Sequence, residues 1–229
     1  RPPRGGAGAA VKALRLFLLA SLAACSAPPD DVKPNAAGLI RLPCHAASPQ
    51  PVNVSYCLLG RNYVTPASRS AIVSAAAKMA ARYPGFVLFY MDASGADGHR
   101  PFPPHLSHGD GREVDLALVY DGRDGRPLRK PPTPTGYYAN VNPRPGDPLP
   151  CKGATAPHRV ADPPPTVPWR LDEARTRDLV LAVIQEPGVK RLFLEPHLKL
   201  RLGLWDQPKV HFQGCWAARH DDHIHVDLY

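Results

Sequence analysis

The chain has 229 residues, 44% of them hydrophobic, and a formal net charge of +8. This length and composition fit one domain with one core. Residues 1–24 hold four basic and no acidic side chains, so their removal lowers the charge to +4 and leaves no dense run of Lys and Arg. This argues against nucleic acid as a partner, while the oligomeric state stays open. The 29 prolines are clustered, which predicts long loops around a compact centre.

The N-terminus has the pattern of an export signal. Residues 1–24 begin with basic side chains, continue with a short apolar run and end in small residues. The apolar run is too short to span a bilayer as a helix. Its ending, LAAC up to Cys25, resembles the lipobox of bacterial lipoproteins, and Ser26 resembles the outer-membrane pattern. We therefore predict a signal peptide over 1–24, a tether over 25–55 anchored in outer-membrane lipid through Cys25, and a periplasmic location. The alternative is an ordinary secretory signal with a chance cysteine.

Four further cysteines follow the signal. An even number of cysteines in an exported protein favours two disulfides, and three connectivities are open. The chain has no C-x-x-C pair, which makes a zinc site built on cysteines a weak hypothesis. These cysteines are Cys44, Cys57, Cys151 and Cys215.

The remaining domain, residues 56–229, begins with a strong helix signal. Apolar side chains recur at three- and four-residue spacing over 66–82, with Thr65 in the capping position. The continuous apolar run over 86–91 predicts a buried strand. Alternation over 113–120 predicts a second strand, with Asp115 on its more polar face.

A long insertion over 121–168, rich in Pro, Gly and Arg, separates this part from the C-terminal elements. After it the pattern predicts a helix over 172–186, a strand over 190–194, a short helix over 196–204 and a final strand over 223–228. Helices and strands do not alternate regularly. We therefore expect an α+β fold with a small, mostly antiparallel sheet.

His108 and Asp115 are the first pair of residues that indicates chemistry. The glycine-containing stretch between them can turn and enter the strand, which would bring His108 back over Asp115. A carboxylate on a strand otherwise rich in Val and Leu is costly unless it is paired or bound to a metal. The plainer interpretation is that Asp115 pairs with Arg112.

His223 and His225 form the second pair, on the last predicted strand. Residues two apart on a strand point the same way, so one can bind a metal while the other faces a substrate. If this strand lies beside that of Asp115, a His/Asp/His site results, and three such ligands with an open fourth position are typical of catalytic zinc. Taken alone, an H-x-H pattern is more often a surface or core pair.

The two motifs together resemble a known family. The segment from Ser107 to Asp115 matches the pattern S-H-x-x-G-x-x-x-D, and His223-Ile224-His225 matches a later H-x-H. This combination resembles lysostaphin-type peptidases, D-Ala-D-Ala peptidases and hedgehog domains, and within them most closely the penicillin-insensitive murein endopeptidases. The resemblance covers about residues 63–228 without the insertion. It implies a hedgehog/DD-peptidase-like fold.

The resemblance also implies a role for each motif residue. The zinc ligands would be His108, Asp115 and His225. His223 resembles the catalytic histidine, with His220 as its partner, while His105 and Ser107 would lie at the substrate. Asp222 stands where the D-Ala-D-Ala dipeptidases place a general base, and its plainer interpretation is a solvated side chain beside Asp221. Which group handles the proton stays open.

The implied activity is zinc-dependent hydrolysis of peptide bonds between D-amino acids in the cross-links of peptidoglycan, with Zn²⁺ as the cofactor. One alternative is a D-Ala-D-Ala carboxypeptidase or dipeptidase. Others are a non-catalytic, zinc-containing lipoprotein that binds the cell wall, and a periplasmic metal-binding protein. The loop over 92–100 departs from the family's usual Gly-rich, Arg-containing form, so the substrate contacts need not carry over.

Overall fold

The computed structural model of the protein describes residues 33–99, 101–103, 105–151 and 167–229. At its centre is a six-stranded sheet with the strand order β2-β4-β5-β10-β8-β9. The pairs β2–β4 and β8–β9 are parallel, and the other three are antiparallel, so the α+β fold has a mixed sheet. The strands are β2 (Gln50–Pro51), β4 (Phe89–Tyr90), β5 (Glu113–Ala117), β8 (Val189–Phe193), β9 (Val210–His211) and β10 (His223–Leu228).

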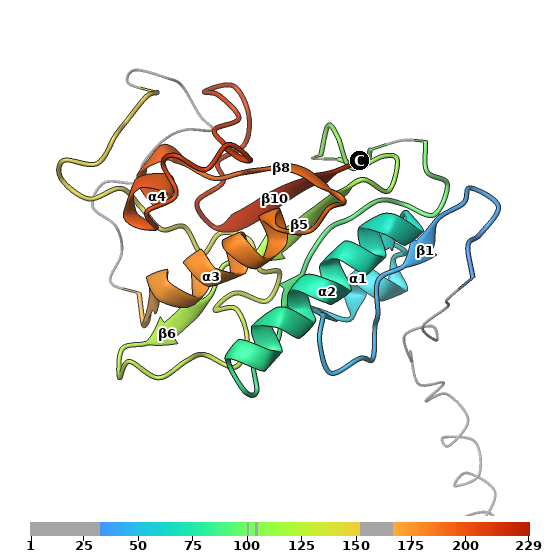
Figure 1. Cartoon of the computed structure of the whole chain (residues 1–229), viewed down its shortest axis with the longest axis horizontal. Helices are drawn as coiled ribbons and strands as arrows, with labels where there is room; N and C mark the ends of the chain where they lie inside the picture. Colours follow the sequence, from blue (N-terminus) through green and yellow to red (C-terminus); the bar gives the residue numbers. More distant parts are fainter. Residues whose placement is uncertain (1–32, 100, 104, 152–166) are drawn as a thin grey trace, which may run out of the picture.

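Two long helices, α2 (Pro66–Arg82) and α3 (Glu173–Ile184), lie side by side against the sheet (Figure 1). Both begin at a side-chain cap: Thr65 accepts a hydrogen bond from a backbone N–H in the first turn of α2, and Asp172 does the same for α3. The bounds of α2 agree with the sequence prediction. The predicted helix over 172–186 is shorter in the structure, because Asp172 is its cap.

The sheet has one apolar and one polar face. In β5 and β10 the even-numbered residues are fully buried and pack in the main core with α2 and α3, as Val114, Leu116, Ile224 and Val226 show. Because side chains alternate along a strand, the odd-numbered residues point to the opposite face. That face carries Asp115, and it is the side on which the candidate site lies.

The smaller elements connect this framework at its edges. Two-stranded ribbons pair β1 (Ile40–Arg41) with β3 (Tyr63–Val64) and β6 (Tyr120–Gly122) with β7 (Trp169–Leu171). The short helices are α1 (Ser55–Leu58) and α4 (Pro196–Arg201). In the described part of the chain no helix is long and apolar enough to cross a membrane.

Two predicted strands are shorter than their apolar runs. The strand expected over 86–91 is reduced to Phe89–Tyr90, which pairs with both residues of β2 and, through Tyr90, with Leu116 of β5. The strand expected over 113–120 ends at Ala117, since the backbone of Val119 then bonds with Thr176 and Asp172 at the start of α3. The predicted strand over 190–194 lies one residue earlier, at Val189–Phe193, and the predicted helix over 196–204 ends at Arg201.

The predicted tether over 25–55 is partly wrong. Leu39, Ile40 and Leu42 are buried, and both β1 and β2 fall within that range. The apolar side chains of this segment join the core, so from about residue 39 the chain belongs to the folded domain. The predicted signal peptide and Cys25 lie outside the described residues.

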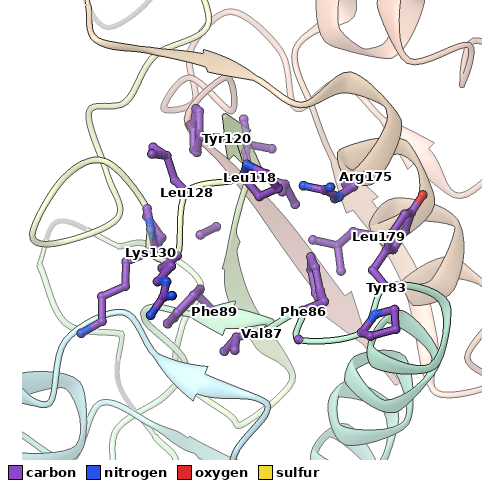
Figure 2. Close-up of a pocket in the computed structure, with 17 residues that line it drawn as sticks. Tyr83, Phe86, Val87, Phe89, Leu118, Tyr120, Leu128, Lys130, Arg175 and Leu179 are labelled. Atoms are coloured by element: carbon purple, nitrogen blue, oxygen red, sulfur yellow. The ribbon is translucent and has the colours of Figure 1, made fainter. Parts of the chain in front are cut away.

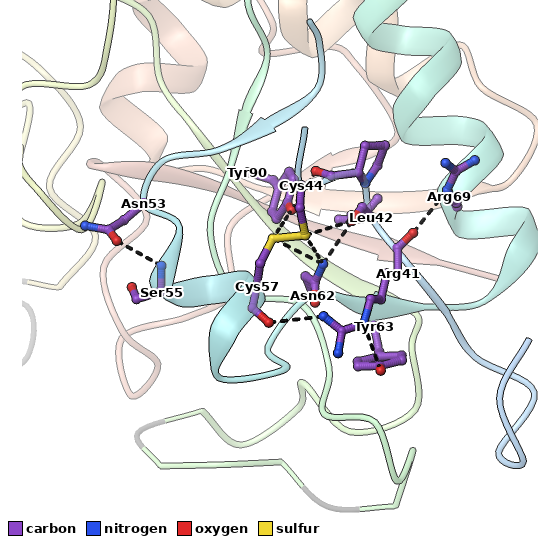
Figure 3. Close-up of a disulfide and its surroundings, with 11 residues drawn as sticks. Arg41, Leu42, Cys44, Asn53, Ser55, Cys57, Asn62, Tyr63, Arg69 and Tyr90 are labelled. Carbon is purple, nitrogen blue, oxygen red and sulfur yellow. Dashed lines mark hydrogen bonds between the residues drawn. A yellow bond between two sulfur atoms is a disulfide. The ribbon is translucent and has the colours of Figure 1, made fainter. Parts of the chain in front are cut away.

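Two disulfides are present, as predicted, and they join Cys44 to Cys57 and Cys151 to Cys215. The first connects the N-terminal segment to α1. Around it, the side-chain amide of Asn62 donates to the carbonyl oxygen of Leu42 and contacts both sulfur atoms (Figure 3). This disulfide therefore closes a loop within residues 39–57 and joins the N-terminal segment to α1.

Candidate metal centre

Neighbouring strands β5 and β10 bring the two sequence motifs together. In their antiparallel register His225 lies directly opposite Asp115, and His223 lies opposite Ala117. Directly opposed residues on one face of an antiparallel pair have closely spaced side chains. His108 reaches the same point from the loop before β5, as the glycines of that loop allow. The structure therefore brings together the three residues that the motifs predicted as ligands.

The donor atoms of these residues are close to one another. The Nδ1 atom of His225 is 2.9 Å from Oδ1 of Asp115, and Nε2 of His108 is 3.3 Å from the same oxygen. The two ring nitrogens are 3.2 Å apart. Ligands about 2.0–2.1 Å from a tetrahedral ion lie roughly 3.3–3.4 Å from one another. Two of the three distances are close to this value, and the third, between His225 and Asp115, is shorter.

Hydrogen bonds on the outer side of each imidazole determine which nitrogen faces this point. The Nδ1 atom of His108 is 3.0 Å from the carbonyl oxygen of Ala93, and Nε2 of His225 is 3.1 Å from Oδ1 of Asp227. A carbonyl or carboxylate oxygen only accepts, so these ring nitrogens carry the protons. The other nitrogen of each ring faces inward and is the one that would bind a metal ion once it has lost its proton, as in metal-bound histidines.

Three potential ligand atoms thus face one point in the protein interior. Asp115 is fully buried, while His108 and His225 are 1% and 4% exposed. Acceptors that face one another without water or a cation between them are destabilising. Burial lowers the pKa of His225, but its hydrogen bonds to Asp115 and Asp227 outweigh that effect and raise the pKa to about 10. A proton on His225 relieves the repulsion in one way, and a metal ion would relieve it in another.

His105, His108 and Asp115 also form a group that could bind a metal ion, with ligand atoms within 4.8 Å of one another. His105 had been predicted as a substrate-side residue. Its Nε2 atom is 2.9 Å from Oδ2 of Asp92, and its Nδ1 atom is 4.0 Å from Oδ2 of Asp115. His105 therefore lies at the edge of the cluster and approaches Oδ2 of Asp115, whereas His225 contacts Oδ1. Ser107 is exposed, and its side chain makes no hydrogen bond in the described part of the chain.

His223 lies beside this cluster and is oriented by Asp222. Its Nδ1 atom is 2.5 Å from Oδ1 of Asp222, and its Nε2 atom points inward, 3.8 Å from Oδ1 of Asp115. Burial lowers the pKa of His223, but the charges of Asp115 and Asp222 outweigh this and raise it. The solvated interpretation of Asp222 is wrong, because this residue is only 6% exposed and its other oxygen accepts from the backbone N–H of Tyr138.

His220 lies on the same side of the site. Its ring centroid is 4.8 Å from that of His223 and 5.6 Å from that of His225, and its backbone N–H donates to Glu195. It is thus a neighbour of both motif histidines, whereas the resemblance implied only a partnership with His223. The ring of Phe193 on β8 packs against His220 and His225, so this wall of the site is aromatic.

Sequence reasoning missed Tyr137 and Asp92. The Tyr137 hydroxyl lies 2.6 Å from Oδ2 of Asp115 and 3.0 Å from Oδ2 of Asp92, and Arg61 pairs with Asp92 at 2.7 Å. Burial, followed by the charges of Asp115 and Asp92, raises the pKa of Tyr137 well above its usual value, so the hydroxyl keeps its proton and donates. One available signal was the position of Asp92, a carboxylate directly after a buried apolar run.

The charge on Asp115 follows from these neighbours. Burial raises the pKa of Asp115, but the charges of His108 and His223 and the hydrogen bonds from the ligand histidines hold it well below the usual range. Asp115 is therefore a carboxylate at neutral pH. The predicted alternative, a pair between Asp115 and Arg112, is wrong, because Arg112 pairs with Asp110 instead.

An apolar hollow of about 660 Å³ lies elsewhere, between the end of α2, the start of α3 and β5 (Figure 2). Phe86, Phe89, Leu118 and Leu179 line it, and none of the candidate site residues does. The candidate chemistry is therefore confined to the polar face of the sheet.

No protein-family model matches the chain, and no curated protein is significantly similar to it.

Proposed function

We propose that this protein is a zinc-dependent peptidase that hydrolyses D-amino-acid peptide cross-links in peptidoglycan. The observation that carries the proposal is the convergence of three inward-facing donors, from His108, Asp115 and His225, with a fourth side left to His223. The metal, the reaction and the polymer rest on the chemistry of this donor set and on the motif resemblance. An export signal and a lipid anchor at Cys25 would place the enzyme at its substrate.

The donor set fits zinc better than the hard divalent cations. Two imidazole nitrogens and one carboxylate oxygen are typical zinc ligands, whereas calcium and magnesium prefer oxygen ligands in larger number. We assign His225 as the third protein ligand and His105 as a wall residue. This choice follows from distance, since the His225 nitrogen is 2.9 Å from the Asp115 carboxylate and the nearest free nitrogen of His105 is 4.0 Å from it.

When bound, a zinc ion supplies Lewis-acid polarisation of an amide carbonyl and activation of water. The chain supplies the proton chemistry and the geometry. The inward nitrogen of His223 is positioned to exchange a proton with the reacting groups or to stabilise negative charge on the carbonyl oxygen. Asp222 holds the other nitrogen of that ring, which fixes its tautomer and orientation. We therefore assign Asp222 an orienting role and assign the proton transfer to His223.

The test is incubation of the purified protein with cross-linked muropeptide dimers, with and without a chelator. We expect cleavage of the dimers, its loss on chelation and its recovery when Zn²⁺ is added back. A β-lactam should leave the activity intact, because no serine nucleophile takes part. Absence of chelator-sensitive cleavage would sink the proposal, and release of terminal D-Ala alone would favour a carboxypeptidase.

Three alanine variants test the division of roles. His225→Ala should lose both bound zinc and activity, whereas His223→Ala should keep stoichiometric zinc and lose turnover. His105→Ala should keep zinc and part of the activity. If His105→Ala loses zinc while His225→Ala retains it, the third ligand is His105 and our assignment is wrong.

A further inference from the structure

Tyr138 combines an exposed ring with a strained backbone. Its φ angle is +68°, the only positive value at a non-glycine among the described residues. Its side chain is 81% exposed, so the ring contributes little to the core. A left-handed conformation is unfavourable for a residue with a Cβ atom and persists only where the surroundings hold it.

The contact that holds Tyr138 comes from the candidate site itself. Its backbone N–H donates to Oδ2 of Asp222 at 2.5 Å, and the other oxygen of that carboxylate holds the ring of His223. The preceding residue, Tyr137, donates to Asp115. Tyr137 and Tyr138 are thus hydrogen-bonded to Asp115 and Asp222 respectively. The carboxylate that orients His223 therefore also positions the backbone that carries the exposed ring.

Tyr138 stands at the edge of a groove of about 930 Å³. Trp169, Arg170 and Arg144 also line this groove. The Arg144 and Arg170 side chains are 63% and 65% exposed although each has a carboxylate partner, Glu173 and Asp121 respectively. A guanidinium has five N–H donors, so each keeps donors that its partner does not use.

We propose that this groove binds an extended, carboxylate-bearing peptide, and that Tyr138 is the platform on which the peptide rests as it enters the site. An exposed aromatic ring supplies contact area at little cost in conformational entropy, and exposed guanidinium groups recognise carboxylates in pairs of hydrogen bonds. The inference rests on the proposed function for the identity of the peptide, a stem of peptidoglycan.

Binding of a purified muropeptide dimer, measured by calorimetry on the zinc-loaded His223→Ala protein, tests the platform without consuming the ligand. In this background Tyr138→Ala and Tyr138→Gly should each weaken binding roughly tenfold, and Tyr138→Phe should change it less than twofold. Glycine relieves the backbone strain and alanine does not, so Tyr138→Gly should unfold at a higher temperature than Tyr138→Ala.

The comparison of Tyr138→Gly with Tyr138→Ala separates the effect of the lost ring from the effect of backbone strain. A merely structural role predicts that binding follows stability, so that Tyr138→Gly binds better than Tyr138→Ala. Equal losses of binding with unequal melting temperatures would support the platform. Binding by both variants within twofold of the parent protein would overturn it.

The anion contacts have their own test. The double variant Arg144→Gln with Arg170→Gln should weaken binding of the dimer with free carboxylates, and should leave binding of the amidated dimer unchanged. Arg129→Gln with Lys130→Gln is the matched control, because it removes the same charge from residues that line the apolar hollow and not the groove. An equal effect of both double variants would show general charge attraction and would overturn the groove assignment.

The two proposals fail separately. Binding with the expected losses, but without chelator-sensitive cleavage by the wild-type protein, would refute the peptidase and leave the groove standing. Cleavage with no effect of the Tyr138 and arginine variants would do the reverse. No binding of either dimer by the zinc-loaded protein would overturn the groove.

Discussion

Replacing Tyr137 by phenylalanine removes a single hydroxyl group from the candidate metal centre. That hydroxyl donates to Oδ2 of Asp115, which leaves Oδ1 as the oxygen that faces His108 and His225. The phenylalanine ring can keep its contact with His223, whose centroid lies 5.1 Å away. The substitution therefore removes the hydrogen bond to a ligand and the longer contact of the same hydroxyl with Asp92.

The expected size follows from the charge on the acceptor. A hydrogen bond to a charged group contributes about 1.5–3 kcal/mol. Loss of an outer-shell partner of a metal ligand typically lowers metal affinity about 10–100-fold. In Tyr137→Phe the Oδ2 atom of Asp115 loses its closest donor, since the next candidate, Nδ1 of His105, is 4.0 Å away. We therefore expect zinc affinity to fall about 10–100-fold.

Competition with a chromophoric zinc chelator measures this affinity directly. Tyr56→Phe is the matched control, because its hydroxyl donates to the backbone oxygen of Thr135 in the same loop at 2.7 Å and touches no ligand. The control should lose some stability and bind zinc within about threefold of wild type. Unchanged zinc affinity in Tyr137→Phe, with the fold intact, would refute the orienting role of Tyr137.

Three further predictions concern stability. Burial lowers the pKa of His197 to about 4, below the ordinary 6.5, so the unfolded chain binds the proton more tightly than the folded protein does. The free energy of unfolding should therefore fall by up to about 3 kcal/mol as the pH drops from 6.5 to 4. Urea unfolding should show a shallower fall for His197→Gln. Gly136→Ala places a Cβ atom against Met91 at a φ of +86° and should lower the free energy of unfolding by about 2–4 kcal/mol. Gly146 also has a positive φ but faces open space, so Gly146→Ala should lower it by only about 1–2 kcal/mol in the same denaturant titration. Removing the disulfide that spans 64 residues should cost about 4 kcal/mol, against about 3 for the one that spans 13; equal losses in paired Cys→Ser variants would contradict this ranking.

The parts of the fold that sequence predicted well are those with strong local signals. Helix α2 begins and ends where expected because a capping threonine and a proline mark its start and a Pro-Gly pair follows it. Strand β10 has its expected bounds because its alternation is sharp. His108, Asp115 and His225 could be grouped because period-two alternation fixes which face of a strand each side chain takes, once the two strands are neighbours.

The parts that sequence missed depend on contacts between distant segments. Strand β4 pairs with β2, about 40 residues earlier in the chain, and with β5, and no property of the apolar run itself reveals these partners. Tyr137 lies in an insertion with no periodicity, 22 residues after the aspartate that it contacts. Asp222 looked like one of two solvated acids, and only the fold shows both of its oxygens occupied by His223 and Tyr138.

The part of the insertion around Tyr137 therefore belongs to the site. Between Tyr137 and Val141 it runs beside β5 and the segment just before β10: Tyr137 contacts Asp115, and Asn140 donates to Asp221 at 2.8 Å. The backbone N–H of Val141 also donates to the carbonyl oxygen of Asp221. These contacts link the insertion to the segment that carries the motif histidines. A shortened loop would thus lose both the Tyr137 donor to Asp115 and the Tyr138 backbone donor to Asp222. These contacts explain why Tyr137 to Val141, which have no helix or strand periodicity, adopt an ordered course beside the candidate metal centre.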